Sequence, residues 1–250
     1  MLEGIHKIHL IGIGGSGMRA IANILIQKGY EVSGSDVKES DVIERFRKMG
    51  ATVHIGHNAD YVQGVDAVVR STAIREDNPE IVAAKEQGIT ILHRSDIVKA
   101  VLDVTNGIAV AGAHGKTSTT SMIGQILVEG QMEPTVIIGG EVDYLKGSSC
   151  LGKGEYSVVE ADESDGSFLK LRPKTIVITN IEDDHMDHYK TMENLLNAFC
   201  QFVETLPVDG KAVVCGDNDN IRYVMSKVER QFITYGLEDS NEKKKKNIHY

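Results

Sequence analysis

The stretch Val110-Ala111-Gly112-Ala113-His114-Gly115-Lys116-Thr117-Ser118 decides the fold of this 250-residue chain. It follows a short apolar run, 107–110, that has the composition of a buried strand. A strand, a glycine-bearing turn that ends in Gly-Lys-Thr and a following helix form the arrangement that binds a nucleoside triphosphate. The expected helix covers 119–128, where apolar residues recur at helical spacing: Met122, Ile123, Ile126 and Leu127.

The loop contains the groups that a triphosphate needs. Its glycines let the backbone approach the phosphates, and the N–H groups at the helix N-terminus point at their negative charge. Lys116 would neutralise the β- and γ-phosphates, and the Thr117 hydroxyl would bind Mg²⁺. The common pattern has a glycine where this chain has Val110, so Gly112 gives a shorter form, and a glycine turn before an ordinary helix is the alternative. The predicted phosphate-binding residues are Gly112, Ala113, His114, Gly115, Lys116, Thr117 and Ser118.

Length and composition limit the classes of protein to consider. At 250 residues, two domains are the expected organisation. A net charge of −9 argues against a nucleic-acid partner, because duplex binding requires a basic face. Three widely spaced cysteines (Cys150, Cys200 and Cys215) form neither a metal pattern nor a disulfide framework, which favours a reducing compartment. With no signal peptide and no apolar stretch near the ~20 residues that span a bilayer, we expect a soluble, cytoplasmic protein without membrane insertion.

A second glycine loop lies near the N-terminus. Gly12, Gly14 and Gly17 stand in G-x-G-x-x-G register between a predicted strand, 8–11, and a helix that ends before Gly29. The next strand, 31–34, leads to Asp36, which could accept a ribose hydroxyl. This pattern indicates a diphosphate-bearing ligand. NAD and a nucleotide sugar fit it equally, and a ligand-free tight turn is the alternative. The nearby His6 and His9 are expected to be side chains at the strand edge.

Strands and helices continue to alternate along the chain, which predicts parallel sheets covered on both faces, with ligands at the carboxyl ends of the strands. Ser71-Thr72-Ala73-Ile74 and His93-Arg94 follow two further predicted strands, 66–70 and 90–92, so they should share one rim with the first glycine loop and Asp36. We place the domain boundary at 104/105, because a new strand-loop-helix unit starts directly afterwards. The predicted fold is therefore α/β, with a Rossmann-like domain at 1–104 and a domain with a phosphate-binding loop at 105–250.

Two predicted strands of the second domain end in acidic residues. Glu160 ends the strand 156–161, and the strand 174–179 leads into an acidic segment that contains His185. Acidic strand ends beside a Gly-Lys-Thr loop outline a site for a hard cation. We expect metal roles for Thr117, Glu160 and His185. A solvated acidic loop is the alternative for either cluster.

Together these motifs resemble the Mur ligases of peptidoglycan synthesis, and in particular their alanine-adding branch. The resemblance covers nearly the whole chain and rests on six motifs: Gly-Ile-Gly-Gly-Ser-Gly-Met (12–18), Ser-Thr-Ala-Ile-Arg-Glu-Asp-Asn-Pro-Glu (71–80), His-Arg-Ser (93–95), Gly-Ala-His-Gly-Lys-Thr-Ser (112–118), Glu-Ala-Asp-Glu-Ser-Asp (160–165) and Thr-Asn-Ile-Glu-Asp-Asp-His-Met-Asp-His-Tyr (179–189).

The resemblance implies a UDP-sugar in the first domain, ATP at 112–118 and Mg²⁺ on Thr117, Glu160 and His185. It implies an ATP-dependent ligase, with Lys116, Glu160 and His185 as catalytic residues. The lactyl carboxylate of UDP-N-acetylmuramate would attack the γ-phosphorus, and the amine of L-alanine would then displace phosphate from the acyl phosphate. The residues expected at the UDP-sugar are Gly12, Gly14, Gly15, Ser16, Gly17, Met18, Asp36, Ser71, Thr72, Ala73, His93 and Arg94.

Two features qualify this interpretation. Members of the family have three domains and are longer, and the segment 247–250 reads as the start of a strand, so we expect a truncated form that binds nucleotides without completing catalysis. The competing hypothesis is an NAD(P)-dependent oxidoreductase built on the loop 12–17. That hypothesis gives the Gly-Lys-Thr motif no purpose.

Overall fold

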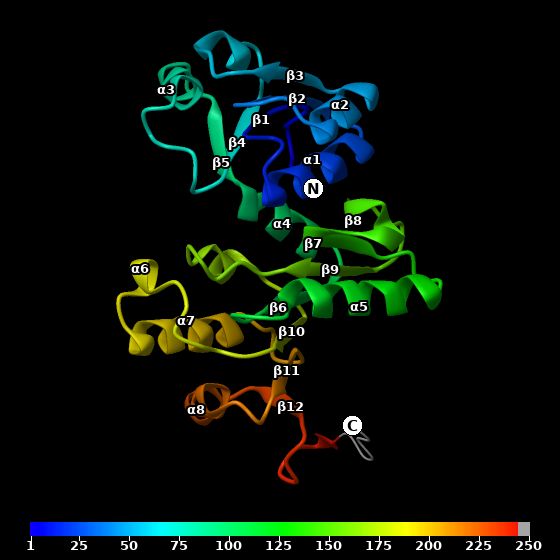
Figure 1. The fold of residues 1–250 in the computed structure, drawn as a ribbon, viewed down its shortest axis with the longest axis vertical. Coiled ribbons are helices and arrows are strands. Elements are labelled where there is room, and N and C mark those ends of the chain that lie inside the picture. The colour runs from blue at the N-terminus through cyan, green and yellow to red at the C-terminus, as the bar shows by residue number, and fades with distance from the viewer. Residues whose placement is uncertain (245–250) are drawn as a thin grey trace. The chain divides into compact units, whose positions relative to one another are not determined.

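The computed structural model describes residues 1–244, so the strand expected at 247–250 lies outside the described residues. The chain divides into two compact units, Met1–Ala100 with Thr135–Lys153 and Val101–Pro134 with Gly154–Tyr250. Both contain strands and helices in alternation (Figure 1). This confirms the predicted α/β fold class.

The first unit contains a parallel sheet with strand order β3-β2-β1-β4-β5. The first strand, β1, lies in the middle of the sheet; β2 and β3 are added on one side of it, and β4 and β5 on the other. In open parallel sheets, ligands bind outside the carboxyl ends of the strands at the point where the strand order reverses in this way. The strands are β1 (Lys7–Ile11), β2 (Glu31–Asp36), β3 (Thr52–Ile55), β4 (Ala67–Arg70) and β5 (Thr90–His93). The helices are α1 (Ser16–Gln27), α2 (Asp41–Lys48), α3 (Pro79–Glu86) and α4 (Arg94–Leu102), with a 3₁₀ turn at Ala59–Val62.

Local sequence explains where these helices start. Ser40 caps α2 by accepting a hydrogen bond from the Ile43 N–H, and Asn78 caps α3 ahead of Pro79 in the first turn. Buried apolar residues of α1 form the stripe that faces the sheet, as the helical spacing predicted: Met18, Ile21, Ala22, Ile24 and Leu25.

An antiparallel hairpin of β7 (Thr135–Val142) and β8 (Gly147–Cys150) also belongs to the first unit. It packs against α1. The Asn23 side-chain amide donates to the Ser149 carbonyl at 2.9 Å, and the Ser149 hydroxyl donates to the Ala20 carbonyl at 2.8 Å. The sequence analysis did not predict β8, because Gly-Ser-Ser-Cys lacks the β-branched and aromatic residues typical of strands.

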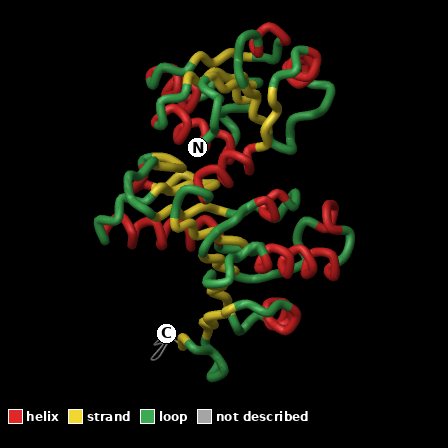
Figure 2. The backbone as a smooth tube through the Cα atoms, turned by 180° about the vertical axis from the view of Figure 1, so that it is seen from behind, coloured by secondary structure: helices red, strands yellow, loops and turns green. Residues whose placement is uncertain are grey.

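The second unit contains parallel strands in the order β13-β12-β11-β10-β6-β9. Strands are drawn in yellow and helices in red in Figure 2. The strands β6, β9 and β10, which precede the second glycine loop and the two acidic segments, are neighbours in this sheet, so their carboxyl ends meet at one edge. The strands are β6 (Asn106–Ala111), β9 (Tyr156–Glu160), β10 (Thr175–Ile178), β11 (Lys211–Cys215), β12 (Gln231–Gly236) and β13 (Lys243–Lys244). The helices are α5 (Lys116–Glu129), α6 (Met186–Tyr189), α7 (Met192–Glu204) and α8 (Asp219–Lys227), with a 3₁₀ turn at Ser167–Lys170.

The core of the second unit corrects one detail of the sequence analysis. Ile123 and Leu127 of α5 pack on the cluster of Val110, Val158 and Val177, but Met122 and Ile126 are 59% and 69% exposed. Residues four apart share a face, so the four apolar residues form two adjacent stripes, of which one faces the sheet. The helix also begins three residues earlier than expected, at Lys116.

No helix in the described part of the chain is both long and apolar enough to cross a membrane.

Candidate nucleotide-binding sites

The first glycine loop is a tight turn braced by the end of β2. The N–H groups of Gly12 and Ile13 donate to the Ser35 carbonyl at 2.8 and 3.0 Å, and the Gly14 N–H donates to Asp36 Oδ2 at 2.9 Å. A Cβ atom at Gly14 would lie 3.0 Å from that same oxygen, so a side chain would push the loop away from Asp36. Asp36, predicted to accept a ribose hydroxyl, holds the loop itself in this structure.

The helix that follows this loop has no side-chain cap. Its N-cap residue, Gly15, forms no side-chain hydrogen bond, whereas α2, α3, α7 and α8 are each capped by a Ser, Thr or Asn side chain. The first N–H groups of a helix have no partner within the helix. At α1 these groups are therefore left for a ligand, and a phosphate is well suited to accept from them.

A cation lies beside this loop. The Arg94 guanidinium contacts Gly17, where a Cβ atom would lie 3.0 Å from Arg94 Nη1. Arg94 follows directly after β5, and His93, the last residue of that strand, has Nε2 3.2 Å from Thr72 Oγ1. His93 is held by a contact of 2.8 Å between Nδ1 and the Ser95 hydroxyl. The rim predicted from strand ends thus brings Arg94 to the first loop and Thr72 to His93.

Other residues predicted to contact the UDP-sugar lie in different environments. Met18 is buried, while Ser71 and Ala73 belong to the turn closed by the bond from the Ile74 N–H to the Ser71 carbonyl. The exposed Gly15 and Ser16 lie at the start of α1.

The second glycine loop is clamped by the end of β10. The Asn180 side chain forms two bonds with the backbone of His114, accepting from its N–H at 2.9 Å and donating to its carbonyl at 3.0 Å. The Thr179 hydroxyl also donates to the His114 carbonyl, at 2.6 Å. Gly112 is the close-approach position, because its Cβ atom would collide with the Thr179 hydroxyl and lie 2.8 Å from the Asn180 carbonyl oxygen. Like Gly15, the N-cap residue Gly115 forms no side-chain hydrogen bond.

Lys116 is held inside this loop. Its Nζ donates to the carbonyl oxygen of Gly112 at 2.6 Å and to Glu163 Oε1 at 2.6 Å. The Glu163 side chain is 2% exposed, and burial raises the pKa of its carboxyl group while the neighbouring Lys116 ammonium opposes that rise. The Tyr189 hydroxyl donates to the Glu163 carbonyl oxygen at 2.5 Å, and burial together with the nearby carboxylates raises the pKa of Tyr189.

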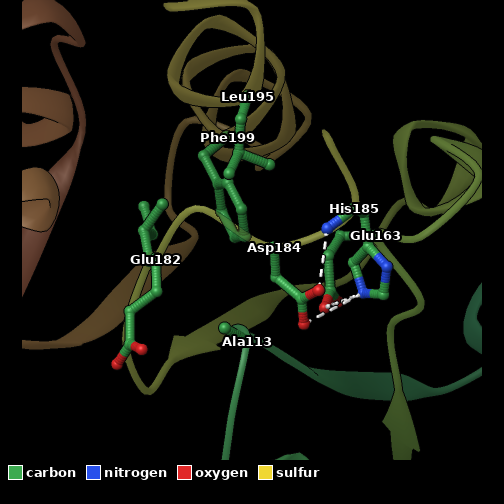
Figure 3. Close-up of a pocket in the computed structure, with 8 residues that line it drawn as sticks. Ala113, Glu163, Glu182, Asp184, His185, Leu195 and Phe199 are labelled. Atoms are coloured by element: carbon green, nitrogen blue, oxygen red, sulfur yellow. Dashed lines mark hydrogen bonds and ion pairs between the residues drawn. The ribbon is translucent and has the colours of Figure 1, made fainter. Parts of the chain in front are cut away.

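The two other predicted catalytic residues come from neighbouring strand ends. Glu160 ends β9, in register with Val110 at the start of the loop. His185 follows β10 and has its Nε2 atom 3.6 Å from Glu163 Oε1 and 3.5 Å from Asp184 Oδ2 (Figure 3). Its backbone has φ +58°, the left-handed region, a costly conformation for a residue with a side chain.

A pocket lies beside these groups (Figure 3). It is lined by the loop, by Glu163 from the segment after β9, by the acidic segment after β10 and by apolar side chains of α7: Ala113, Glu163, Ile181, Glu182, Asp184, His185, Leu195 and Phe199. The pocket therefore has charged groups on one side and an apolar floor on the other.

The donor set suits a magnesium ion bound together with phosphates. Mg²⁺ takes oxygen ligands and is usually held by one or two protein groups plus phosphate oxygens and water. Thr117 and Glu160 offer such oxygens, and Glu163 Oε2 is a buried carboxylate oxygen without a hydrogen-bond partner in the described structure. In the described residues no group of three or more His, Cys, Asp or Glu side chains could hold a metal ion alone.

Sequence reasoning missed two residues of this site. Glu163 lies within the Glu-Ala-Asp-Glu-Ser-Asp motif, but nothing in the motif distinguishes it from its three acidic neighbours. Asn180 lies within the segment 179–189, whose motif does not single it out. The signal that could have found it is its position two residues after β10, where a short amide can bind the backbone of an adjacent loop.

Two glycine loops at the carboxyl ends of parallel strands, the second ending in Gly-Lys-Thr, are typical of α/β proteins that bind nucleotides. The chain matches the family model described as "Mur ligase family, catalytic domain" over residues 7–104 and the "Mur ligase middle domain" over residues 110–250. The chain belongs to the Mur ligase family, and the oxidoreductase considered above finds no support.

Curated relatives and solved structures match the chain, among them a UDP-N-acetylmuramate:L-alanyl-gamma-D-glutamyl-meso-diaminopimelate ligase from Neisseria meningitides, with a TM-score of 0.87 and 27% identity over 93% of this chain and 78% of that one. The chain is 47% identical over 232 residues to a UDP-N-acetylmuramate--L-alanine ligase of Desulfatibacillum aliphaticivorans, covering 93% of this chain and 51% of that protein. It is 46% identical to the enzyme of the same name from Lawsonia intracellularis, covering 96% and 53%. The crystal structure of the UDP-N-acetylmuramate-alanine ligase MurC from Thermotoga maritima matches with a TM-score of 0.83 and 31% identity, over 93% of this chain and 53% of that one. The chain thus spans about half the length of the curated relatives it matches.

Proposed function

We propose that this chain provides the sugar-nucleotide-binding and ATP-binding parts of an L-alanine-adding Mur ligase, acting in the cytoplasm on peptidoglycan precursors. The observation that carries this proposal is the arrangement around Lys116, whose ammonium group lies within a clamped glycine loop and against a buried carboxylate. Relatives 46–47% identical bear the name UDP-N-acetylmuramate--L-alanine ligase, which supports the choice of substrates.

The proposed reaction joins the lactyl carboxylate of UDP-N-acetylmuramate to the amine of L-alanine. The carboxylate oxygen attacks the γ-phosphorus of ATP and releases ADP, and the amine then attacks the acyl carbon and releases phosphate. Activation is required because a carboxylate is a poor electrophile. In phosphoryl transfer the protein mainly positions the reactants and neutralises charge.

The residues of the second loop meet these needs. The uncapped N-terminus of α5 offers N–H groups to the phosphates, and Lys116 supplies a positive charge that must leave Glu163 for a γ-phosphate. Thr117, Glu160 and His185 would hold Mg²⁺, which when bound polarises the phosphate oxygens. In the first unit, the α1 N-terminus and Arg94 would hold the diphosphate of the sugar nucleotide.

The test is turnover in a protein of the relatives' full length. Lys116→Ala should lower ADP release by about a hundredfold or more, because it removes a charge aimed at the transferred group. Binding of UDP-N-acetylmuramate, measured by calorimetry, should stay unchanged. The matched control is Lys174→Ala. Lys174 is an exposed lysine just before β10 whose ammonium group donates a hydrogen bond to the Asn106 side chain. Equal turnover in the two variants would refute the role of Lys116, and ADP release independent of UDP-N-acetylmuramate would refute the ligase.

We propose further that the 250 residues by themselves bind UDP-N-acetylmuramate through 1–104 and ATP through 105–250 without forming the amide. Calorimetry with each nucleotide tests binding, and mass spectrometry of a mixture with L-alanine tests product. Amide formed by the purified chain would contradict the second half of this statement.

A further inference from the structure

The ammonium group of Lys116 has a protein acceptor for each of its N–H donors. Its Nζ atom lies 2.6 Å from the Gly112 carbonyl oxygen, 2.6 Å from Glu163 Oε1 and 3.3 Å from the Ala113 carbonyl oxygen. A lysine ammonium group has three donors and no acceptor. A phosphate oxygen can therefore accept a hydrogen bond from Lys116 only when one of these three contacts is given up.

The contact with Glu163 differs from the other two because it joins opposite charges. The carbonyl oxygens of the loop are neutral, whereas the Glu163 carboxylate cancels the charge of the ammonium group. The side chains of Lys116 and Glu163 are 19% and 2% exposed, so water screens their attraction only weakly. The closed pair therefore reduces the positive charge that the empty loop presents to a triphosphate.

Glu163 is the fixed member of this pair. Its carbonyl oxygen accepts hydrogen bonds from the Tyr189 hydroxyl at 2.5 Å and from the Gly166 N–H at 3.1 Å. These bonds tie the backbone of Glu163 to the last residue of α6 and to the turn that follows Glu163 in the chain. Lys116 reaches the carboxylate through a long side chain whose bonds can rotate. A phosphate that attracts the ammonium group would move Lys116 and leave Glu163 in place.

Separating the pair leaves a buried carboxylate without a hydrogen-bond donor. Oε2 of Glu163 has no hydrogen-bond partner in the described structure. Nε2 of His185 lies 3.6 Å from Glu163 Oε1, which is beyond the range of a hydrogen bond. Because a buried charge without a partner is unfavourable, part of the free energy of nucleotide binding must be used to separate Lys116 from Glu163. The same free energy favours the return of Lys116 once the phosphates leave.

We propose that Glu163 is a positioning residue that holds the Lys116 ammonium group in the empty loop and competes for it with the phosphates of ATP. Glu163 acts through Lys116. The inference rests on the proposed function, because it assumes that the loop 112–118 binds ATP. Each turnover then ends with the return of Lys116 to Glu163, and this return favours the release of ADP.

The first test is calorimetry with ATP in a buffer that contains EDTA, so that no Mg²⁺ binds the carboxylates. Glu163→Gln keeps the shape of the side chain and removes its charge. It should bind ATP about tenfold more tightly than the wild type, because a neutral amide oxygen competes less strongly for the ammonium group. Unchanged or weaker binding by a folded Glu163→Gln chain overturns the inference, because Glu163 would then support Lys116 in the complex.

The matched control is Glu129→Gln. Glu129 is an exposed carboxylate at the C-terminal end of α5, where it accepts a hydrogen bond from the Gln125 side chain. The substitution removes the same charge from the second unit but leaves the pair of Lys116 and Glu163 closed. The affinity for ATP should therefore stay within about twofold of the wild-type value. A tenfold gain in this control would show that net charge, and not the pair, sets the affinity.

A second background separates competition from simple repulsion between Glu163 and ATP. In Lys116→Ala there is no ammonium group to hold, so adding Glu163→Gln should tighten ATP binding by at most about twofold. Displacement of a fluorescent ATP analogue extends this measurement to weak affinities. Equal gains in the two backgrounds would refute the positioning role, because the whole gain would then come from the loss of repulsion.

Chemical labelling reads the restraint on Lys116 without any nucleotide. The chain is treated with an acetylating reagent, and the rate at each lysine is followed by mass spectrometry. Lys116 should react about tenfold faster in Glu163→Gln than in the wild type, because only an amine released from its acceptors attacks the reagent. Lys174, whose acceptor is the Asn106 side chain, should react equally in both chains. Equal rates at Lys116 would contradict the proposed restraint.

Melting temperatures report whether each variant is folded. If Glu163→Gln is not, Glu163→Asp replaces it, since the shorter side chain withdraws the carboxylate from Lys116 and should change ATP binding and labelling in the same direction. A wild-type chain that binds ATP while folded Glu163 variants bind it no more tightly overturns this inference and leaves the proposed function intact. A wild-type chain that does not bind ATP refutes the ATP site of the proposed function, and the labelling rates still decide whether Glu163 holds Lys116.

Discussion

Truncating Glu80 to Ala should destabilise the first unit severely. The change removes the acceptor of three hydrogen bonds of 2.8 Å, from His9 Nε2, the Ser35 hydroxyl and His57 Nδ1, and the first two of these donors are fully buried. A buried donor left without a partner costs about 1–3 kcal/mol, so these two together cost about 2–6 kcal/mol. We therefore expect the free energy of unfolding to fall by about 4 kcal/mol.

The assay is urea unfolding followed by far-ultraviolet circular dichroism, with hydrogen exchange of β1 and β2 peptides to locate the loss in the first unit. The control is Glu76→Ala, in the loop just before α3. Glu76 is 63% exposed and pairs with Arg70 and Lys85, so its loss should cost at most about 1 kcal/mol. A Glu80→Ala chain no less stable than Glu76→Ala would refute the reasoning, because it would mean that the buried carboxylate is not needed by its donors.

Three further outcomes are expected. Folding lowers the pKa of Glu80, so the stability that its ionised carboxylate contributes is fully present above the unfolded pKa of about 4.3 and is lost as the pH falls through the folded pKa. Between pH 6 and pH 3, the urea midpoint should therefore fall less for Glu80→Gln than for the wild type. Gly112→Ala should weaken ATP binding in calorimetry and cost about 1–3 kcal/mol in urea unfolding, because its Cβ atom meets the Thr179 hydroxyl; an unchanged ATP affinity would contradict the close approach. Phe168→Ala should cost about 3–5 kcal/mol in the second unit, since Phe168 is fully buried; a loss below about 1 kcal/mol would show that the core refills the space.

Much of the fold followed from local sequence patterns. The apolar runs that became β1, β4, β6, β9 and β10 and the glycine turns after two of them were readable, because short buried strands and close-approach glycines are encoded locally. The same patterns place Glu160 at a strand end, as the structure has it, whereas they start the helix at 119 and the structure starts it at Lys116.

The remainder depends on contacts between distant residues. The pairing of His9 with Glu80 spans 71 positions and leaves no periodic signal, so His9 was assigned to a strand edge. The contact of Glu163 with Lys116 likewise requires the sheet to bring two strand ends together. The helical spacing of the apolar residues correctly predicts helix α5, but it does not show that Met122 and Ile126 lie on the exposed stripe of that helix. Periodicity identifies an element, whereas the tertiary structure decides which of its faces is covered.

The β7–β8 hairpin has a consequence for dissecting the chain. Family models divide the sequence at 104/110, which assigns the hairpin to the later part, yet the hairpin packs with the earlier unit through Asn23 and Ser149. A fragment of residues 1–104 would keep α1 but lose the surface that covers it, leaving Ala20 and Asn23 without their partners. The segment matched by the first family model and the compact unit that contains it are thus different sets of residues. Cutting at the family boundary should give an aggregation-prone first half, whereas a fragment that carries 135–153 through a linker keeps α1 covered.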